Sequence, residues 1–258
     1  MCPQDLGRRI LLEVPVDSVG VGMRMQEQSV LLRQLDHLAH VGQVGIGTVD
    51  MELADRHEEV FAVVGWHPNA ARSFALTDLD RLRDWYAHPK VVGIGEIGLD
   101  YFRDHATPIE QREATIAQLR LASALDSPVV VHCRDAYDDL LDLFEHEKPR
   151  LWVLHCFAGT TAHAERALGL GAYFGVDGPI TYKSANALRE TIALLPRDRV
   201  VVETDAPFLP PEPHRGRENQ PAYSALVNLN LAQLWGVSPE EAAAITTQNA
   251  EALFPKLR

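Results

Sequence analysis

The chain has 258 residues, of which 46% are hydrophobic, and 24 Lys and Arg against 36 Asp and Glu give a formal net charge of −12. This apolar fraction excludes a disordered chain and is enough for one large hydrophobic core. The acidic charge argues against a protein that coats duplex DNA through a basic surface, so attraction to a nucleic acid would have to come from a local site such as bound divalent cations.

The cysteine content and the length of the apolar runs indicate the compartment. Cys2, Cys133 and Cys156 form an odd, sparse set that does not match a disulfide framework. No apolar stretch reaches the roughly 18 residues that a transmembrane helix needs. Glu13 and Pro15 interrupt the apolar N-terminal segment, and no small-residue cleavage site follows, which argues against an export signal. We therefore expect a cytoplasmic monomer without a membrane span.

Short, β-branched apolar runs alternate with segments of helical periodicity along the chain. Such runs are typical of parallel strands that are buried on both faces. The candidate strands, in chain order, are residues 10–16, 44–49, 60–65, 91–94, 128–131, 151–154, 172–176 and 200–202. The predicted helices between them include residues 109–124, 136–144, 162–170 and 184–195.

This alternation predicts an α/β fold with a parallel sheet. Eight candidate strands favour closure into a single TIM-type (β/α)8 barrel over residues 1–258, a fold whose usual size is about 250 residues. The alternative is an open α/β sheet, but no G-x-G-x-x-G or P-loop motif follows the first run. From residue 231 onward we expect one or two closing helices, because Ser238, Pro239, Glu240 and Glu241 form a typical helix start.

Polar residues stand where the apolar runs end. His67, Glu96, His132, His155 and Asp205 follow the runs that end at residues 65, 94, 131, 154 and 202. The C-terminal ends of barrel strands share one face, where active sites lie. We therefore expect Glu96, His132, His155 and Asp205 to converge, with His67 near them.

Two histidines and two carboxylates suit Zn²⁺, Mn²⁺, Mg²⁺ or Fe²⁺. Glu96 could bridge two such cations, and Asp205 could bind a cation and accept the proton of an attacking water. Each residue alone also has a structural explanation, since a histidine after a strand is often only hydrogen-bonded and an aspartate before Ala-Pro can form a turn. Four of them at four strand ends favour a metal site.

The motifs around these residues resemble those of a known family. They are GWHP (65–68), GEIGLDY (95–101), PVVVHCRDA (128–136), HCF (155–157), ETDAP (203–207) and NAEALF (249–254). In this order they resemble the motifs of TatD-type metal-dependent DNases, which belong to the amidohydrolase-like barrel superfamily. The resemblance extends from about residue 60 to the C-terminus.

The resemblance implies that Glu96 bridges two divalent cations (Mg²⁺, Mn²⁺ or Zn²⁺). It also implies that His132 and His155 bind one of them and that Asp205 binds the other. Glu96 and Asp205 would be the catalytic residues, and DNA, as ends or single strands, would be the substrate.

The resemblance further implies that His67, Arg134 and Lys183 lie near the scissile phosphate. For Arg134 and Lys183 a solvated position on the barrel rim explains the charge equally well. The segment 215–221 resembles a family loop that usually contains Arg-Asn-Glu-Pro but departs from it, which leaves the roles of Arg217 and Asn219 open.

The N-terminal part of the chain departs further from the family pattern. The family's first strand ends in a His-x-His pair that binds the cation shared by the bridging glutamate and the late aspartate, and this chain has no His-x-His. Residues 11–17 offer only Glu13 and Asp17, and the earliest histidines, His37 and His40, lie in a predicted helix. A disrupted N-terminus, a site with one cation and a catalytically inactive relative all remain open.

Three hypotheses for function follow. The first is a metal-dependent hydrolase of phosphodiester bonds, a TatD-like deoxyribonuclease that uses a metal-activated water. The second is a non-catalytic barrel that binds one cation or none. The third keeps the same chemistry but acts on amide or ester bonds, because carbonyl attack uses the same polarised water.

Overall fold

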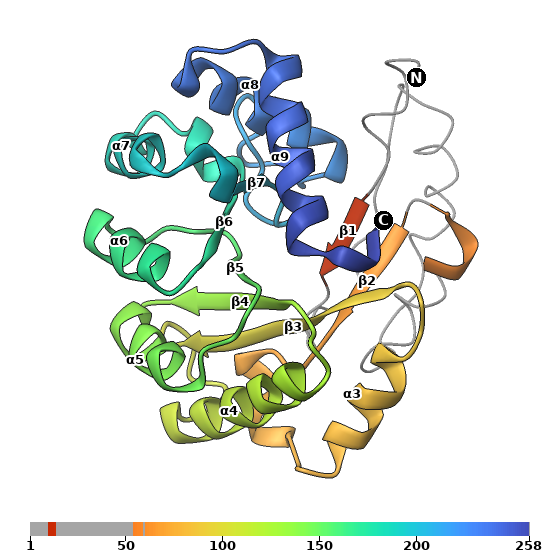
Figure 1. The fold of residues 1–258 in the computed structure, drawn as a ribbon. Helices are drawn as coiled ribbons and strands as arrows, with labels where there is room; N and C mark the ends of the chain where they lie inside the picture. The colour runs from red at the N-terminus through yellow and green to blue at the C-terminus, as the bar shows by residue number, and fades with distance from the viewer. Residues whose placement is uncertain (1–9, 14–53, 59, 258) are drawn as a thin grey trace.

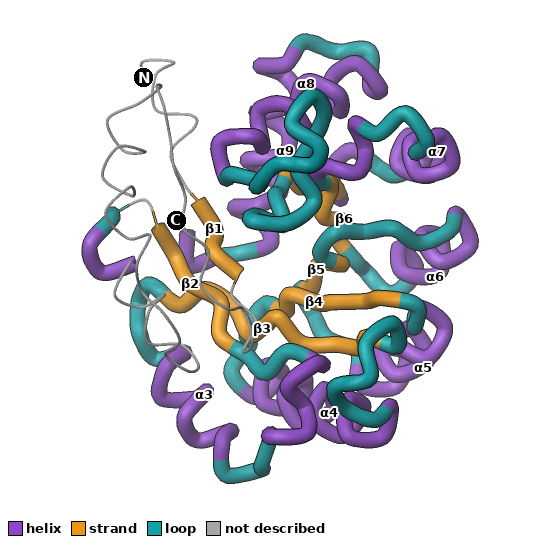
Figure 2. Tube along the Cα trace, turned by 180° about the vertical axis from the view of Figure 1, so that it is seen from behind, coloured by secondary structure: helices purple, strands orange, loops and turns teal. Residues whose placement is uncertain are grey.

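The computed structural model describes residues 10–13, 54–58 and 60–257. Within them, parallel strands in the order β1 to β7 form one sheet, and each strand is hydrogen-bonded to the next one in the chain. The strands are β1 Ile10–Glu13, β2 Val60–Val64, β3 Val91–Asp100, β4 Val129–Arg134, β5 Trp152–Leu154, β6 Tyr173–Val176 and β7 Val200–Val202. The sheet curls, and the helices lie around its outer side (Figures 1 and 2).

The helices fill the connections between strands, as a βα alternation requires. They are α3 Asp78–Tyr86, α4 Pro108–Ala124, α5 Tyr137–Glu147, α6 Thr161–Gly169, α7 Asn186–Leu194, α8 Ser224–Trp235 and α9 Pro239–Leu253. Short 3-10 turns are η3 Pro68–Ser73, η4 Gly178–Thr181, η5 Arg197–Arg199, η6 Pro221–Tyr223 and η7 Pro255–Leu257. The predicted start of the last helix is confirmed, because the Ser238 side chain accepts the Glu241 N–H and Pro239 is the first helical residue.

Some predictions fall on residues that the structure does not describe. The candidate strand 44–49, the helix around His37 and His40, and residues 14–17 with Asp17 lie outside the described residues. The first described strand, β1, pairs directly with β2, and Ile10 is opposite Val60.

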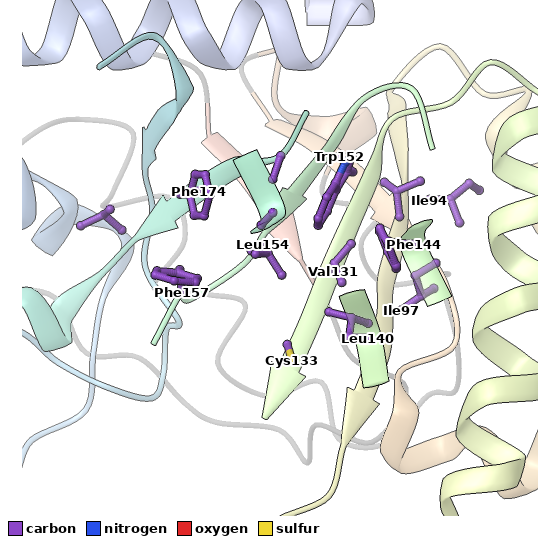
Figure 3. Packing of buried hydrophobic residues seen from close by; sticks show 14 of the residues in the cluster. Ile94, Ile97, Val131, Cys133, Leu140, Phe144, Trp152, Leu154, Phe157 and Phe174 are labelled. Carbon is purple, nitrogen blue, oxygen red and sulfur yellow. The ribbon is translucent and has the colours of Figure 1, made fainter. Parts of the chain in front are cut away.

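Two large clusters, one on each face of the sheet, make up most of the hydrophobic core of the described residues. The outer cluster packs strand residues against the helices; Trp152, Phe144 and Leu140 are among its fully buried side chains (Figure 3). The inner cluster takes one residue from each of β2 to β7 and adds the C-terminal residues: Val63, Val92, Val130, Val153, Tyr173, Val201, Leu253, Phe254 and Leu257. The C-terminal segment therefore covers the concave face of the sheet.

Strand β3 corrects one sequence-based boundary. The run 91–94 was expected to end before Gly95, but β3 continues to Asp100, with a register shift between Ile94 and Ile97. A Cβ atom on Gly98 would lie 2.0 Å from the carbonyl oxygen of His132, and Gly98 has a φ of 141°. Glycine thus allows β3 to pass close to β4 where a side chain would not fit, so Glu96 lies inside a strand and not after one.

Candidate metal centre

The alternation that fills the inner cluster also brings polar side chains to the C-terminal end of the sheet. Strands β4, β5 and β7 each give one valine to the inner cluster, and residues two apart in a strand share a face. The residues two positions after these valines are His132, His155 and Glu203. They therefore lie on the same inner face, at the C-terminal ends of their strands.

The first group of the site is centred on His132. Its Nδ1 lies 2.9 Å from Glu96 Oε1, and its Nε2 lies 3.1 Å from Asp100 Oδ2. Glu96 and Asp100 are buried, at 4% and 2% exposure. Because ionised carboxylates only accept hydrogen bonds, both ring nitrogens of His132 donate in this arrangement.

Electrostatics agree with this protonation. Burial disfavours the charged ring, but the carboxylates of Glu96 and Asp100 outweigh it and raise the pKa of His132 to about 9. Burial also opposes the Glu96 carboxylate, yet the charges of His155 and His132 hold its pKa well below the usual range. A cation that binds here would take the place of a proton shared between these groups.

His67 completes the first group from the segment after β2. Its ring centroid lies 4.5 Å from that of His132, and its Nδ1 accepts the Asn69 backbone N–H at 3.1 Å. Burial lowers the pKa of His67 to about 4, so the ring is neutral near pH 7. A neutral ring whose Nδ1 accepts carries its proton on Nε2. His67 therefore offers a hydrogen-bond donor at Nε2.

The second group is centred on His155. Its Nδ1 donates to Glu203 Oε2 at 3.0 Å, and its Nε2 lies 3.5 Å from Asp205 Oδ1. The other carboxylate oxygen of Glu203 accepts the backbone N–H of Cys156 at 2.5 Å. A Cβ atom on Gly175 would lie 2.1 Å from Glu203 Oε1, so the absence of a side chain at Gly175 makes room for this carboxylate.

A buried thiol and carboxylic acid lie beside this second group. Cys156 Sγ donates to Asp177 Oδ2 at 2.8 Å. Burial and the neighbouring Glu203 charge raise the pKa of Asp177 to about 7, and burial raises the pKa of the Cys156 thiol. Both groups therefore favour their neutral forms more than usual, which limits the negative charge on this side of the site.

The donor set fits divalent cations. Two combinations bring one ligand atom of each residue within 4.8 Å of the others: His67, Glu96 and His132, and His155, Cys156 and Asp205. Among the described residues, the ion pairs of Glu96, Asp100, Glu203 and Asp205 are all made to histidine. Carboxylates beside imidazoles match the ligand preferences of Zn²⁺ and Mn²⁺.

The remaining predicted residues lie farther out. Arg134 is exposed, and its guanidinium lies 3.7 Å from the Phe102 ring centroid. Lys183 is exposed after η4, and among the described residues no hydrogen bond joins its ammonium group to the site. Asn219 is fully buried, and its amide donates to the Phe208 carbonyl at 2.6 Å, so it holds the loop after β7 together. Arg217 is exposed.

Sequence reasoning missed two carboxylates that contact the histidines. Asp100 and Glu203 both lie inside motifs that had been singled out, GEIGLDY and ETDAP. The inner-face alternation gives a signal for Glu203, because it follows Val201 by two positions. Asp100 gives no such signal, since the register shift in β3 breaks the alternation before it.

Comparisons with known proteins agree on one family. Residues 37–255 match the family model described as TatD related DNase. The metal-dependent hydrolase YcfH of Escherichia coli K12 is 40% identical over 206 residues, which cover 79% of this chain and 77% of that protein. A protein of Escherichia fergusonii named 3'-5' ssDNA/RNA exonuclease TatD is 36% identical over 211 residues, which cover 79% of this chain and 81% of that protein.

A solved structure gives the same result for the fold. The crystal structure of YJJV, a TatD homolog from Escherichia coli K12, matches with a TM-score of 0.76 and 33% identity, and the match covers 80% of this chain and 81% of that one. Together with the curled parallel sheet, this match confirms the predicted barrel class. Among the helices that the structure describes, none has the length and apolar character to cross a membrane.

Proposed function

The chain belongs to the TatD-related DNase family of metal-dependent hydrolases, and from this premise we propose that it cleaves phosphodiester bonds of DNA, at ends or in single strands. The names of relatives such as the Escherichia fergusonii exonuclease support this substrate class. A location in the cytoplasm and a monomeric state stay predictions.

The observation that carries the proposal is that Glu96 contacts His132 and Asp205 lies beside His155. The two histidines directly follow Val131 and Leu154, which pair between β4 and β5. Glu96 Oε1 lies 2.9 Å from His132 Nδ1, and we assign Glu96 the cation-sharing role that the family resemblance implies. His132 belongs to one candidate ligand group and His155 to the other. When bound, a divalent cation lowers the pKa of a coordinated water and stabilises the charge that develops on phosphate.

The protein's own groups supply the remaining functions. The Asp205 side chain is 34% exposed, so it can reach both a cation and a water at the mouth of the site, and we assign it as the proton acceptor. His67 would donate from Nε2 to a phosphate oxygen, in line with its donor tautomer. Arg134 and Lys183 would contact the substrate from the rim.

The number of cations belongs to the proposal as well. The missing His-x-His pair removes two imidazoles from the cation that Asp205 would bind in the family. Cys156 and Asp205 belong to the same candidate ligand group, and Glu13 ends β1, so ligands of other kinds are candidates for this cation. We propose at least one divalent cation per chain.

Hydrolysis of bis(p-nitrophenyl) phosphate and of single-stranded DNA, with Mn²⁺ or Mg²⁺ added, tests the function. We expect activity that EDTA abolishes and that falls by more than about 100-fold in Glu96→Gln and Asp205→Asn, because loss of a ligand costs more than the 10–100-fold typical of groups behind it. Asp198→Asn is the matched control, since Asp198 is exposed and precedes β7 at its opposite end. Wild-type rates in Glu96→Gln would overturn the proposal.

A further inference from the structure

An aromatic ring and two arginines lie next to Asp100, a member of the first group of the site. Phe102 is 55% exposed, although it is a large apolar side chain. The guanidinium carbon of Arg134 lies 3.7 Å from its ring centroid, and that of Arg103 lies 5.5 Å away. Proteins that bind single-stranded nucleic acids stack the bases on exposed aromatic rings, and arginines beside the rings add to the binding.

The backbone fixes this cluster to the metal-site residues. Asp100 Oδ1 accepts the backbone N–H groups of Phe102 and Arg103, both at 3.0 Å, while its other oxygen contacts His132. In the β3–β4 pairing, Asp100 is opposite Arg134, and Gly98 is opposite His132. Phe102 follows the end of β3, and Arg134 is the last residue of β4. Both therefore lie just past the site residues Asp100 and His132 along these two strands.

Several other arginines in the described part of the chain are held by ion pairs. Arg112, Arg120, Arg150 and Arg166 each form an ion pair with a carboxylate. Among the described residues, neither Arg103 nor Arg134 forms such a pair. Their charge remains available to a phosphate, which an acidic chain of net charge −12 needs at a local point.

We infer that Phe102, Arg103 and Arg134 form a platform on which an unpaired nucleobase of the substrate stacks while its phosphate enters the site. The inference rests on the proposed function and adds the part of the substrate that is bound. A duplex keeps its bases stacked on one another, so this contact favours single strands or frayed ends. The ring does not discriminate between deoxyribose and ribose, since only the base face is contacted.

The test compares kcat/KM for short oligodeoxyadenylate with kcat/KM for bis(p-nitrophenyl) phosphate, which has no nucleobase. Phe102→Leu keeps an apolar side chain but removes the aromatic face, and we expect the ratio of the two values to fall about ten-fold, within the range of one lost base stack. Phe102→Trp should preserve or raise the ratio. Leu194→Ala, at a side chain that is 69% exposed on α7, is the control and should leave the ratio unchanged.

Replacing the nucleobases by abasic sites supplies the second arm. If stacking is the cause, wild type and Phe102→Leu should cleave the abasic strand equally, and oligoadenylate should show the same loss as oligodeoxyadenylate. An unchanged ratio in Phe102→Leu, with the oligonucleotide cleaved by both proteins, overturns the inference and leaves the phosphodiesterase proposal standing.

If neither substrate is cleaved, the proposed function fails, and binding decides the inference. Fluorescence anisotropy with labelled oligodeoxyadenylate should then give about ten-fold weaker binding for Phe102→Leu than for wild type. Equal affinities would overturn the platform.

Discussion

At the residue scale, the site depends on which ring nitrogens of His132 and His155 lie against carboxylates. His132 is held at both nitrogens, by Glu96 and Asp100, whereas His155 donates from Nδ1 to Glu203 and directs Nε2 towards Asp205. A metal-binding imidazole is commonly oriented by a carboxylate on its other nitrogen. Glu203 fits that part for His155, and it is a positioning residue because its contacts are to His155 and to the Cys156 backbone.

Substitution of Glu203 should therefore weaken cation binding without unfolding the chain. Glutamine has nearly the same size, but an amide nitrogen replaces one of the two carboxylate oxygens. Because this nitrogen does not accept hydrogen bonds, the side chain cannot accept from both His155 and Cys156. We expect the affinity for Mn²⁺ or Zn²⁺ in Glu203→Gln to fall about 10–100-fold, measured by competition with a chromogenic chelator. Glu190→Gln, on the exposed side of α7, is the control. An unchanged affinity would mean that Glu203 does not position His155.

The sequence was sufficient to single out four candidate site residues for a local reason, and their roles stay predictions. Glu96, His132, His155 and Asp205 stand at or just beyond the ends of apolar runs, and the barrel topology places those ends on one face. Pairings such as Asp100 with His132 depend on the register between two strands. The register between two strands cannot be predicted from the sequence of either strand alone. These contacts therefore became apparent only in the structure.

At the scale of elements, the last helix ties the chain's end to its final strand. The Asn249 amide, in α9, donates to the carbonyls of Arg197 and Val200, both at 2.7 Å, and the side chain is 6% exposed. These carbonyls lie at the start of β7, whose other end leads to Glu203 and Asp205. The motif NAEALF thus has a structural role that the resemblance did not specify.

Removing this amide should destabilise the fold. In Asn249→Ala the buried carbonyl of Val200 and the partly buried carbonyl of Arg197 lose their donor, and we expect the free energy of unfolding to fall by about 1–3 kcal/mol. Urea denaturation followed by circular dichroism measures this change. Gln248→Ala, at the exposed neighbouring position, should stay within about 0.5 kcal/mol of wild type. Equal stability of the two variants would rule out a tie between α9 and β7.

Element boundaries illustrate what the sequence leaves open. The run 91–94 was expected to stop at the first glycine, because glycine commonly ends a strand pattern. In β3 the glycines instead permit close approach to β4, and the strand continues to Asp100. The helix starts were predictable, as at Ser238 and Pro239, since capping depends on a few neighbouring residues.

At the scale of the whole molecule, the alternation of strand and helix was sufficient to predict the barrel class. The inner cluster is closed by Leu253, Phe254 and Leu257, so the barrel has a packed interior on one side and the polar site on the other. The division of the inner face into an apolar part and a polar part follows from the two-residue period of the strands. The candidate strand 44–49 and the role of residues 14–17 stay predictions.

We propose above all that the site around His132 and His155 holds a divalent cation. Metal content by mass spectrometry tests it most directly, on wild type and Glu96→Gln after both have been incubated with excess Mn²⁺ or Zn²⁺ and dialysed. We predict at least one retained cation per chain in wild type and a clearly lower content in Glu96→Gln, because Glu96 supplies the carboxylate of the first ligand group. A wild-type chain that retains no cation, or a Glu96→Gln variant that retains as much as wild type, would contradict the account.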